Sequence, residues 1–237
     1  YKREAMAAAF RILGEGQLSL TKFLLVTDTP QDLRDFRGVL THVLARADFR
    51  TDLYVFGNLS MDTLDYTGPK VNEGSKGVLL GVGEPVRDLP ECFDGEVPSG
   101  VSRIESFCPG CLVVQTDAFA DEPAAASRLA SHPSLANWPL VVLVDDAAQA
   151  VRSAMNFLWV TFTRFEPAAD IHGADVELQR LHPSFTPPVV IDARLKPDFP
   201  DELFCDEETA AKVERRWREY FPQAKVEMGD SDRAHLD

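Results

Sequence analysis

Two stretches of the chain carry the same order of apolar and polar positions. Each opens with an aliphatic run that leads to an aspartate, Asp28 or Asp145, and continues with an amphipathic segment that ends on an arginine, Arg46 or Arg164. Because 117 residues separate the aspartates and 118 separate the arginines, the pattern indicates an internal duplication of a strand, a helix and a second strand. The aliphatic runs occupy residues 23–26 and 140–144.

The first stretch predicts a helix between strands. Residues 5–13 are rich in alanine and predict a helix that ends at Gly14. Residues 31–46 carry apolar side chains at helical spacing, which predicts one buried stripe on a charged helix. Because strands at 53–56 and 77–81 follow this helix, we expect a parallel crossover. The stripe comprises Leu33, Phe36, Val39, Leu40, Val43 and Leu44.

The second stretch predicts a related set of elements. Residues 111–115 and 189–191 predict strands, residues 122–131 a short helix, and residues 148–163 a helix with a wide apolar band. Asp206 predicts the N-terminal cap of a last helix. We therefore predict an α/β fold of two related lobes, each a small, mostly parallel sheet flanked by helices. The last helix is expected to bury a stripe of Ala210, Val213, Trp217, Tyr220 and Phe221.

Prolines mark the expected joint between the lobes. Pro85, Pro90, Pro98 and Pro109 interrupt regular structure before the strand at 111. The chain starts at Tyr1 within a helical pattern, so we expect it to be the C-terminal portion of a longer polypeptide. The predicted division is 1–85 for the first copy, 86–110 for a Pro-rich connection, 111–222 for a second, degenerate copy and 223–237 for a polar tail.

Charge and hydropathy exclude two classes of partner. The chain has 38 acidic and 24 basic residues and a net charge of −14, which repels a phosphate backbone and argues against nucleic acid as a partner. Its apolar runs are shorter than the roughly 20 residues of a membrane span, and no signal peptide opens the chain. We therefore expect a soluble, cytoplasmic protein.

The cysteines leave a choice open. Cys108 and Cys111 have the spacing of a redox dithiol or of half a zinc site. No second pair completes a site, because Cys92, Cys205 and the five histidines show no companion motif. A structural role is favoured, while a metal or redox role stays an alternative.

Acidic and basic residues at element ends also allow two interpretations. Asp28 and the pair Asp145 and Asp146 follow strands at positions where ligands bind in open α/β sheets. The absence of a glycine-rich phosphate turn favours helix capping and gives no support for a nucleotide. Arg46 and Arg164 each precede acids by two and six residues, which favours an ion pair that ties helix to strand, with anion binding as the alternative.

A long loop lies between the strands at 53–56 and 77–81. It contains Asp62 and Asp65, yet no His, Ser or Cys stands at a spacing that would assign catalysis. Its Leu, Met and Tyr content argues against disorder, so we expect it to lie against another surface.

Several short motifs in order resemble the C-terminal part of UbiD-like decarboxylases. They are the strand of residues 20–28, the helix that ends at Arg46, the loop of residues 58–66 and the Gly-Ser-Lys-Gly of residues 74–77. The second copy shares the family's tryptophan-bearing helix and the Thr-Arg-Phe-Glu-Pro-Ala-Ala-Asp run of residues 163–170. The whole chain therefore resembles a long form with a duplicated C-terminal domain, as in menaquinone-pathway members.

This resemblance implies a non-oxidative decarboxylase of aromatic or unsaturated carboxylic acids in menaquinone or ubiquinone biosynthesis. The family uses prenylated FMN with a metal ion, and its catalytic residues lie in an upstream flavin-binding domain. No catalytic residue can therefore be assigned in this chain, which we expect to be inactive and to hold no cofactor alone. The family's C-terminal region forms homo-oligomers and closes over the active site, which implies both roles here.

By position in the family, the loop before Gly-x-Lys contributes to the substrate pocket. This implies Met61 and Leu64 as apolar contacts, with Asn58, Tyr66 and Lys76 as neighbours. Residues 173–186 of the second copy lack this loop, so that copy is expected to be structural. The alternatives are a non-catalytic oligomerisation or scaffold module and, less favoured, a cysteine-based metal or redox protein.

Overall fold

The computed structural model describes residues 2–200 and 205–223, so the tail predicted from residue 223 lies outside it apart from Gln223. The helices are α1 (Ala5–Leu13), α2 (Phe36–Arg46), α3 (Ala125–Ala130), α4 (Ala147–Val151), α5 (Ala154–Arg164), α6 (Pro167–Asp170) and α7 (Glu207–Tyr220). The strands are β1 (Phe23–Thr27), β2 (Leu53–Leu59), β3 (Gly74–Gly81), β4 (Val101–Cys108), β5 (Cys111–Thr116), β6 (Leu140–Val144), β7 (Ile171–His172), β8 (Asp175–Gln179), β9 (His182–Thr186) and β10 (Val189–Asp192).

The strands form two mixed sheets and a hairpin. One sheet has the order β1-β3-β2, the other has the order β4-β5-β6-β10-β7, and β8 pairs with β9. In the first sheet β1 runs parallel to β3, whereas β2 runs antiparallel to it. The prediction of an α/β fold is confirmed, but the prediction of mostly parallel sheets is wrong at β2. That strand lies on the far side of β3, because the loop after it leads straight back into β3.

The strand arrangement of the first sheet recurs inside the second. β6 runs parallel to β10, as β1 does to β3, and β7 runs antiparallel to β10, as β2 does to β3. In the first sheet α2, which ends on Arg46, lies between β1 and β2 along the chain. In the second sheet α5, which ends on Arg164, lies between β6 and β7. The order of elements predicted for the two stretches is therefore present in both sheets.

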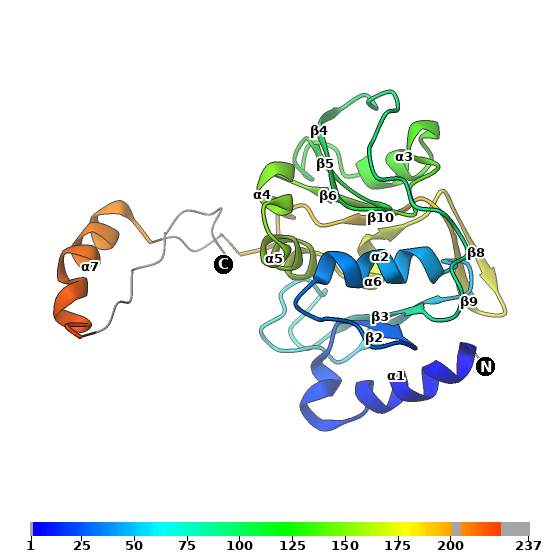
Figure 1. Cartoon of the computed structure of the whole chain (residues 1–237), viewed down its shortest axis with the longest axis horizontal. Helices are drawn as coiled ribbons and strands as arrows, with labels where there is room; N and C mark the ends of the chain where they lie inside the picture. The colour runs from blue at the N-terminus through cyan, green and yellow to red at the C-terminus, as the bar shows by residue number, and fades with distance from the viewer. Residues whose placement is uncertain (1, 201–204, 224–237) are drawn as a thin grey trace.

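The two sheets enclose one core. Figure 1 shows α2, α5 and α6 as a layer between them, with α1 below the first sheet and α3 above the second. Apolar side chains from the inner faces of both sheets join α2 and α5 in one continuous cluster, which includes Leu44, Leu79, Val142 and Phe157. Phe157 stacks on Phe107 with ring centroids 3.8 Å apart. The two sheets therefore share one core, because a buried helix layer needs apolar cover on both sides, and the prediction of two related lobes stays unconfirmed.

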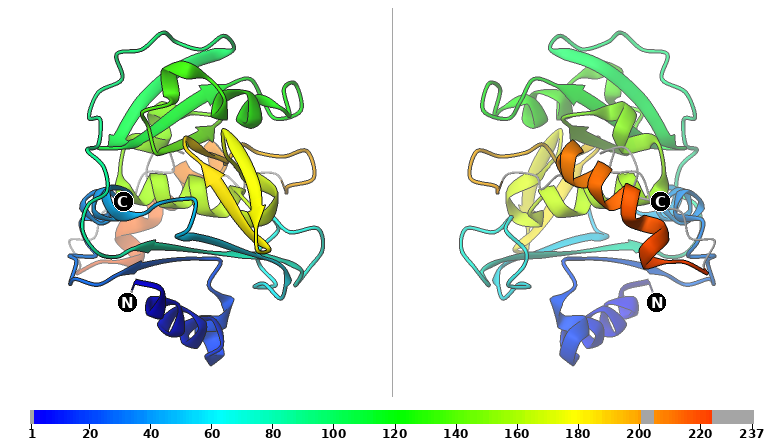
Figure 2. Two further views of the ribbon diagram at one scale, coloured as in Figure 1. Left: turned by 90° about the vertical axis from the view of Figure 1, so that its right-hand side faces the viewer. Right: turned by 90° about the vertical axis from the view of Figure 1, so that its left-hand side faces the viewer.

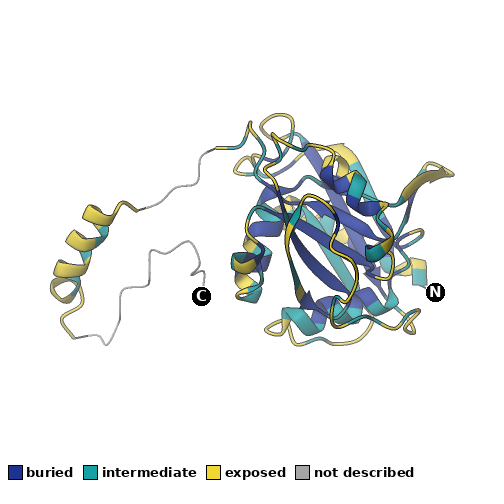
Figure 3. Ribbon diagram, turned by 90° about the horizontal axis from the view of Figure 1, so that it is seen from above, coloured by how far each residue is buried: buried dark blue, intermediate teal, exposed yellow. Residues whose placement is uncertain are grey.

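Three helices differ from their predicted form. The predicted helix at 148–163 is broken into α4 and α5 at Ser153, whose side chain caps α5 by accepting from the Asn156 N–H at 3.0 Å. Leu33 precedes α2 and is exposed, because Asp35 caps that helix. No residue of α7 is buried, so the predicted stripe finds no described surface to cover; Figures 1 and 3 show α7 apart from the sheets.

Among the described residues, no helix combines the length and apolar character that crossing a membrane requires.

The helix layer contains one buried hydroxyl without a partner among the described residues, and this generates a stability prediction. Thr161 of α5 is buried, its Oγ1 forms no hydrogen bond within the described chain, and it borders an apolar cavity of about 30 Å³. Thr161→Val should raise the free energy of unfolding by about 1 kcal/mol, because it removes an unsatisfied polar group at nearly constant shape. Urea unfolding measures the change.

Thr163→Val is the matched control, because the Thr163 hydroxyl donates to the Trp159 carbonyl at 2.6 Å. It should give no gain in stability. A loss of stability in Thr161→Val would show that the hydroxyl has a partner.

Candidate functional site

The loop between β2 and β3 is held by a single buried lysine. Lys22 lies just before β1, and its Nζ contacts the Asp65 carboxylate at 2.7 Å and donates to the Thr67 hydroxyl at 3.0 Å. The same ammonium donates to the carbonyls of Phe162 and Phe165, each at 3.0 Å, at the end of α5. The expectation that the loop lies against another surface is therefore confirmed, and the surface is the end of α5.

Lysine at this place satisfies two demands at once. The last carbonyls of a helix have no partner within it and carry a partial negative charge, so a cation stabilises them. Asp65 supplies the full negative charge that a buried ammonium requires. Burial alone would raise the pKa of Asp65, but hydrogen bonds from Lys22 and Thr67 hold it below its ordinary value.

A second lysine completes the cap of α5. The Lys196 Nζ donates to the Arg164 carbonyl at 2.9 Å and contacts the Asp170 carboxylate at 3.1 Å. It also lies 5.6 Å from the ring centre of Phe119 and 5.4 Å from that of Phe199. Two aromatic faces thus flank the ammonium, which adds cation–π attraction to the ion pair.

The end of α2 is capped in the same way by cations from other places in the chain. Lys2 donates to one carbonyl of the last turn at 3.1 Å and contacts Asp52 at 2.7 Å. Arg87 donates to two further carbonyls, at 2.6 Å each. Both helices therefore end against two cations, one of which binds the aspartate six residues after the helix-end arginine. The carbonyls that accept at the end of α2 are those of Leu44, Arg46 and Ala47.

The predicted role of the two arginines is corrected by these contacts. The aspartates six residues after them bind lysines, so they are not the partners of the arginines. Arg46 donates to the Gly83 carbonyl at 2.9 Å, and Arg164 pairs with Asp145 at 3.2 Å. Arg164 does tie its helix to a strand, as expected, but through the aspartate that follows β6.

The aspartates that follow β1 and β6 have matching roles. Asp28 accepts from the Gly83 N–H and Asp145 from the Leu195 N–H, each at 2.9 Å, and both donors lie just beyond the neighbouring parallel strand. Asp146 caps α4 by accepting from the Gln149 N–H at 2.9 Å. Helix capping is therefore confirmed for Asp146, whereas Asp28 and Asp145 join neighbouring strand ends.

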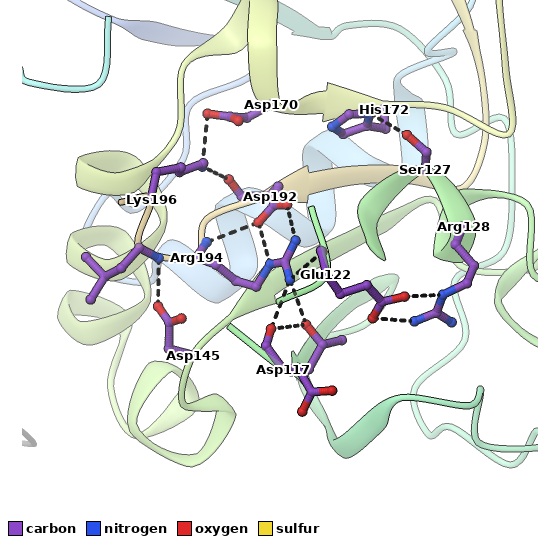
Figure 4. Close-up of polar contacts among 12 residues, drawn as sticks. Asp117, Glu122, Ser127, Arg128, Asp145, Asp170, His172, Asp192, Arg194 and Lys196 are labelled. Carbon is purple, nitrogen blue, oxygen red and sulfur yellow. Dashed lines mark hydrogen bonds and ion pairs between the residues drawn. The ribbon is translucent and has the colours of Figure 1, made fainter. Parts of the chain in front are cut away.

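Figure 4 shows the polar cluster at the ends of β5, β6 and β10. Arg194 is fully buried and forms two hydrogen bonds to Asp192, at 2.9 and 2.6 Å. Its remaining nitrogen donates to the Thr116 hydroxyl and to the carbonyls of Asp117 and Glu122. All of its nitrogens thus have partners, so Arg194 joins the ends of β5 and β10 and is not a free ligand group.

Asp145 is the more accessible of two carboxyl groups in this cluster whose pKa is raised. Burial raises the pKa of Asp145 and of Asp170 above the ordinary value, although Arg164 and Lys196 lie beside them. The Asp145 side chain is 30% exposed, whereas that of Asp170 is 11% exposed and bound to Lys196. A carboxyl group with a raised pKa at a strand end can exchange a proton, so Asp145 is the candidate acid–base group.

The five residues implied by the family resemblance do not converge. Met61 is 3% exposed and its sulfur lies 3.9 Å from the Lys76 Nζ, which also donates to the carbonyls of Ser19 and Thr21. Leu64 is 87% exposed and Asn58 is exposed with a left-handed backbone. Their role in a substrate pocket stays a prediction. Met61 and Lys76 are buried together, whereas Asn58, Leu64 and Tyr66 are exposed.

Tyr66 connects the loop with the polar cluster. Its ring meets Phe199 edge-on at 5.1 Å, and Phe199 covers Lys196. The exposed side of the loop and the ends of β6 and β10 are therefore neighbours. Lys22, Lys196 and Arg194 were missed as site residues. In the sequence each of these residues lies close to an aliphatic run. This pattern predicts where the charged residue lies, but it does not predict which residue it contacts.

Cys108 and Cys111 face each other across the β4–β5 turn and are both free and buried. A hydrogen bond from Cys111 lowers the pKa of the Cys108 thiol, and burial raises the pKa of Cys111. Within residues 2–200 and 205–223, no group of three His, Cys, Asp or Glu could hold a metal ion. The spacing therefore reflects a tight hairpin, and a redox role stays a hypothesis.

Comparison with known proteins identifies the class of the first sheet. Residues 1–81 match the model of the 3-octaprenyl-4-hydroxybenzoate carboxy-lyase C-terminal domain. These residues are therefore similar to a UbiD-like C-terminal domain, in agreement with the resemblance that the sequence motifs indicated. The match ends with β3, so it covers α1 and the sheet β1-β3-β2.

Relatives extend the similarity to both sheets. The chain is 46% identical over 226 residues to a protein of Chlamydia pneumoniae that is named as a subunit of 4-hydroxybenzoate decarboxylase, covering 95% of this chain and 38% of that one. It is 47% identical over 223 residues to an uncharacterized protein of Chlamydia trachomatis serovar D, covering 94% of this chain and 38% of the relative. An uncharacterized protein of Aeropyrum pernix is 33% identical over 96 residues, which are 40% of this chain and 19% of that protein. The chain thus spans about two fifths of the chlamydial proteins.

The buried pair of the cluster generates a prediction about stability. Arg194→Met should lower the free energy of unfolding by about 3–5 kcal/mol, because Asp192 would remain buried without a counter-charge. Arg128→Met is the control, since Arg128 forms a half-exposed pair with Glu122 and such pairs contribute about 0–1 kcal/mol. Equal losses in the two variants, measured by urea unfolding, would contradict the structural role of Arg194.

The Lys22–Asp65 contact predicts how stability depends on pH. The pKa of Asp65 is lower in the folded chain than its ordinary value of 3.8, so the folded state binds fewer protons at this group than the unfolded state. Its stabilising contribution is therefore complete above about pH 4 and is lost as the pH falls through the folded pKa. Asp65→Asn should remove this part of the acid dependence in urea unfolding between pH 6 and 3. An unchanged dependence would argue against a charged Asp65 contact with Lys22.

Proposed function

We propose that this chain is the C-terminal region of a UbiD-like carboxy-lyase in which the loop between β2 and β3 covers the substrate side of an active site built upstream. The match of residues 1–81 to a carboxy-lyase C-terminal domain carries this proposal. The name of the C. pneumoniae relative supports it and adds 4-hydroxybenzoate as an acid to test. A role in quinone biosynthesis belongs to the proposal on the strength of the family resemblance alone.

The loop has a form suited to covering a site. Lys22 fixes its Asp65 and Thr67, so the exposed side chains around them are held in place. Leu64 and Val71 are 87% and 76% exposed, and the loop presents them away from the core. Burying an apolar side chain of this size contributes roughly 1.5–3 kcal/mol, so both favour a partner surface. In the full-length protein that surface is the flavin-binding domain or the substrate.

The apolar interior between the two sheets does not fit prenylated FMN. A flavin ring is larger than the apolar cavity of about 30 Å³ between the sheets, and no cluster of three His, Cys, Asp or Glu is present among residues 2–200 and 205–223. We therefore propose that the upstream domain holds the cofactor. The chain's part is to position its loop, and it is inactive without that domain.

Oligomerisation is a second function of the same region. α7 carries Val213, Trp217 and Tyr220 along one side, and none of them is buried. An amphipathic helix of this kind is stabilised when its stripe is covered, so α7 is proposed to pack against a second copy of the chain. A scaffold module without catalysis would use the same helix, and flavin absorbance of the full-length protein separates the two functions.

We also infer that the two strand–helix units arose by duplication. The order and direction of β1-β3-β2 recur in β6-β10-β7, and α2 and α5 end against the same pattern of cations and aspartate. The second unit replaces the long loop by the hairpin β8–β9, so the covering function stays with the first unit.

The loop generates a prediction about selectivity. In the full-length enzyme, Leu64→Ala should change the ratio of kcat/KM for 4-hydroxybenzoate and its 3-octaprenyl derivative by about 10–200-fold, because a pocket discriminates by roughly 1–3 kcal/mol per methylene-scale change. Stability should be nearly unchanged, since Leu64 is exposed in this chain.

Met61→Ala is the matched variant from the same loop. Met61 is buried beside Lys76, so its truncation should cost about 2–5 kcal/mol of unfolding free energy. A change of selectivity in Met61→Ala at unchanged stability, with none in Leu64→Ala, would overturn the assignment of the exposed side to the substrate.

A further inference from the structure

A hollow of about 400 Å³ lies away from the loop and the polar cluster. Its walls come from three separate parts of the chain, which are the turn before α1, the turn between α2 and β2, and the tip of the hairpin β8–β9. The left view of Figure 2 shows this hairpin in front of the sheets and above the start of α1. The lining residues are Arg3, Arg50, Thr51, Tyr54, Gln179, Arg180 and His182.

Three guanidinium groups line this hollow, and no carboxylate is among its lining residues. Within the described part of the chain, the side chains of Arg3, Arg50 and Arg180 form no ion pair and no hydrogen bond. The other arginines of the layers behave differently, since Arg37, Arg87 and the helix-end Arg46 all bind backbone carbonyls. The three arginines of the hollow are exposed, and what they share is their position around one concave site.

Two acids near the hollow, Asp52 and Asp48, are already engaged. Asp52 is buried and bound to Lys2 at 2.7 Å, and Asp48 accepts from the Arg50 backbone N–H at 3.1 Å. The whole chain carries a net charge of −14, so three like cations around one hollow are not a general property of its surface. Their mutual repulsion is relieved when an anion lies between them.

The hollow also has an aromatic wall. The Tyr54 and His182 rings lie 4.9 Å apart and are tilted by 60°. The Nε2 of His182 is shielded from solvent and has no hydrogen-bond partner among the described residues. Arg180 and Leu181 form the two-residue turn of the hairpin, and their φ values of 53° and 66° are the left-handed values that a type I′ turn requires.

We propose that this hollow binds a small organic anion that carries at least two phosphate or carboxylate groups. Guanidinium forks match both groups through paired hydrogen bonds, and the rings of Tyr54 and His182 supply a surface for the organic part. The volume is in the range of small-molecule sites, and the concave form favours such a ligand over an acidic protein surface. This site is separate from the proposed carboxy-lyase function and does not depend on it.

The test is calorimetric titration of the 237-residue chain with pyrophosphate and with citrate, at constant ionic strength. These probes distinguish a phosphate ligand from a carboxylate ligand. Saturable binding of at least one of them is expected, and Arg50→Ala or Arg180→Ala should weaken it at least tenfold. Arg50→Lys should recover part of the loss, because it restores the charge without the fork.

Arg34→Ala is the matched control, since Arg34 is an exposed arginine outside the hollow, and it should change binding less than twofold. Thermal unfolding of each variant establishes that it is folded. The proposal is overturned if neither probe saturates, if Arg34→Ala weakens binding as much as Arg50→Ala, or if polyglutamate binds while both small anions fail.

Discussion

The structure depends on what satisfies the carbonyl end of a helix that is enclosed between two sheets. α5 ends inside the protein, where water cannot complete its last hydrogen bonds. Lys22 supplies them from its position just before β1 in the other sheet, and it joins Asp65 and Thr67 to the same point. One ammonium group therefore fixes the helix layer to the first sheet and holds the loop that we propose to cover the substrate.

The same constraint explains how the basic residues are used. α2 and α5 each end against two cations, and an equivalent aspartate binds one of them, although the cations come from positions that do not correspond in the two units. A buried helix end requires positive charge, and any part of the chain that passes nearby can provide it. Lys2, Arg87, Lys22 and Lys196 serve this purpose in a chain whose net charge is −14. Arg3, Arg50 and Arg180 meet instead at one hollow, where we propose that an anion binds.

The loop and the polar cluster form one region of the molecule. Tyr66 rests on Phe199, and Phe199 covers Lys196, so the contacts lead from the exposed loop to the ends of β6 and β10. Lys196, Arg194 and Asp192 stabilise this region, while Asp145 is partly open to solvent beside it. A loop that covers a substrate needs both fixed and exposed residues, because exposed side chains discriminate between substrates only when the backbone beneath them is fixed.

The sequence by itself determined the elements, the repeated order of strands and helices, and the resemblance to carboxy-lyases, because aliphatic runs, helical spacing and short motifs are local. It also indicated Asp146 as a helix cap and the loop as a segment held against a surface. Only the tertiary structure decided that the sheets share one core, that β2 runs antiparallel, and that Met61 is buried while Leu64 is exposed. It also decided that Lys22 bonds to residues about 140 positions away and that Arg3, Arg50 and Arg180 meet at one hollow. These contacts depend on how distant segments approach in space, and no local pattern of residues contains that information.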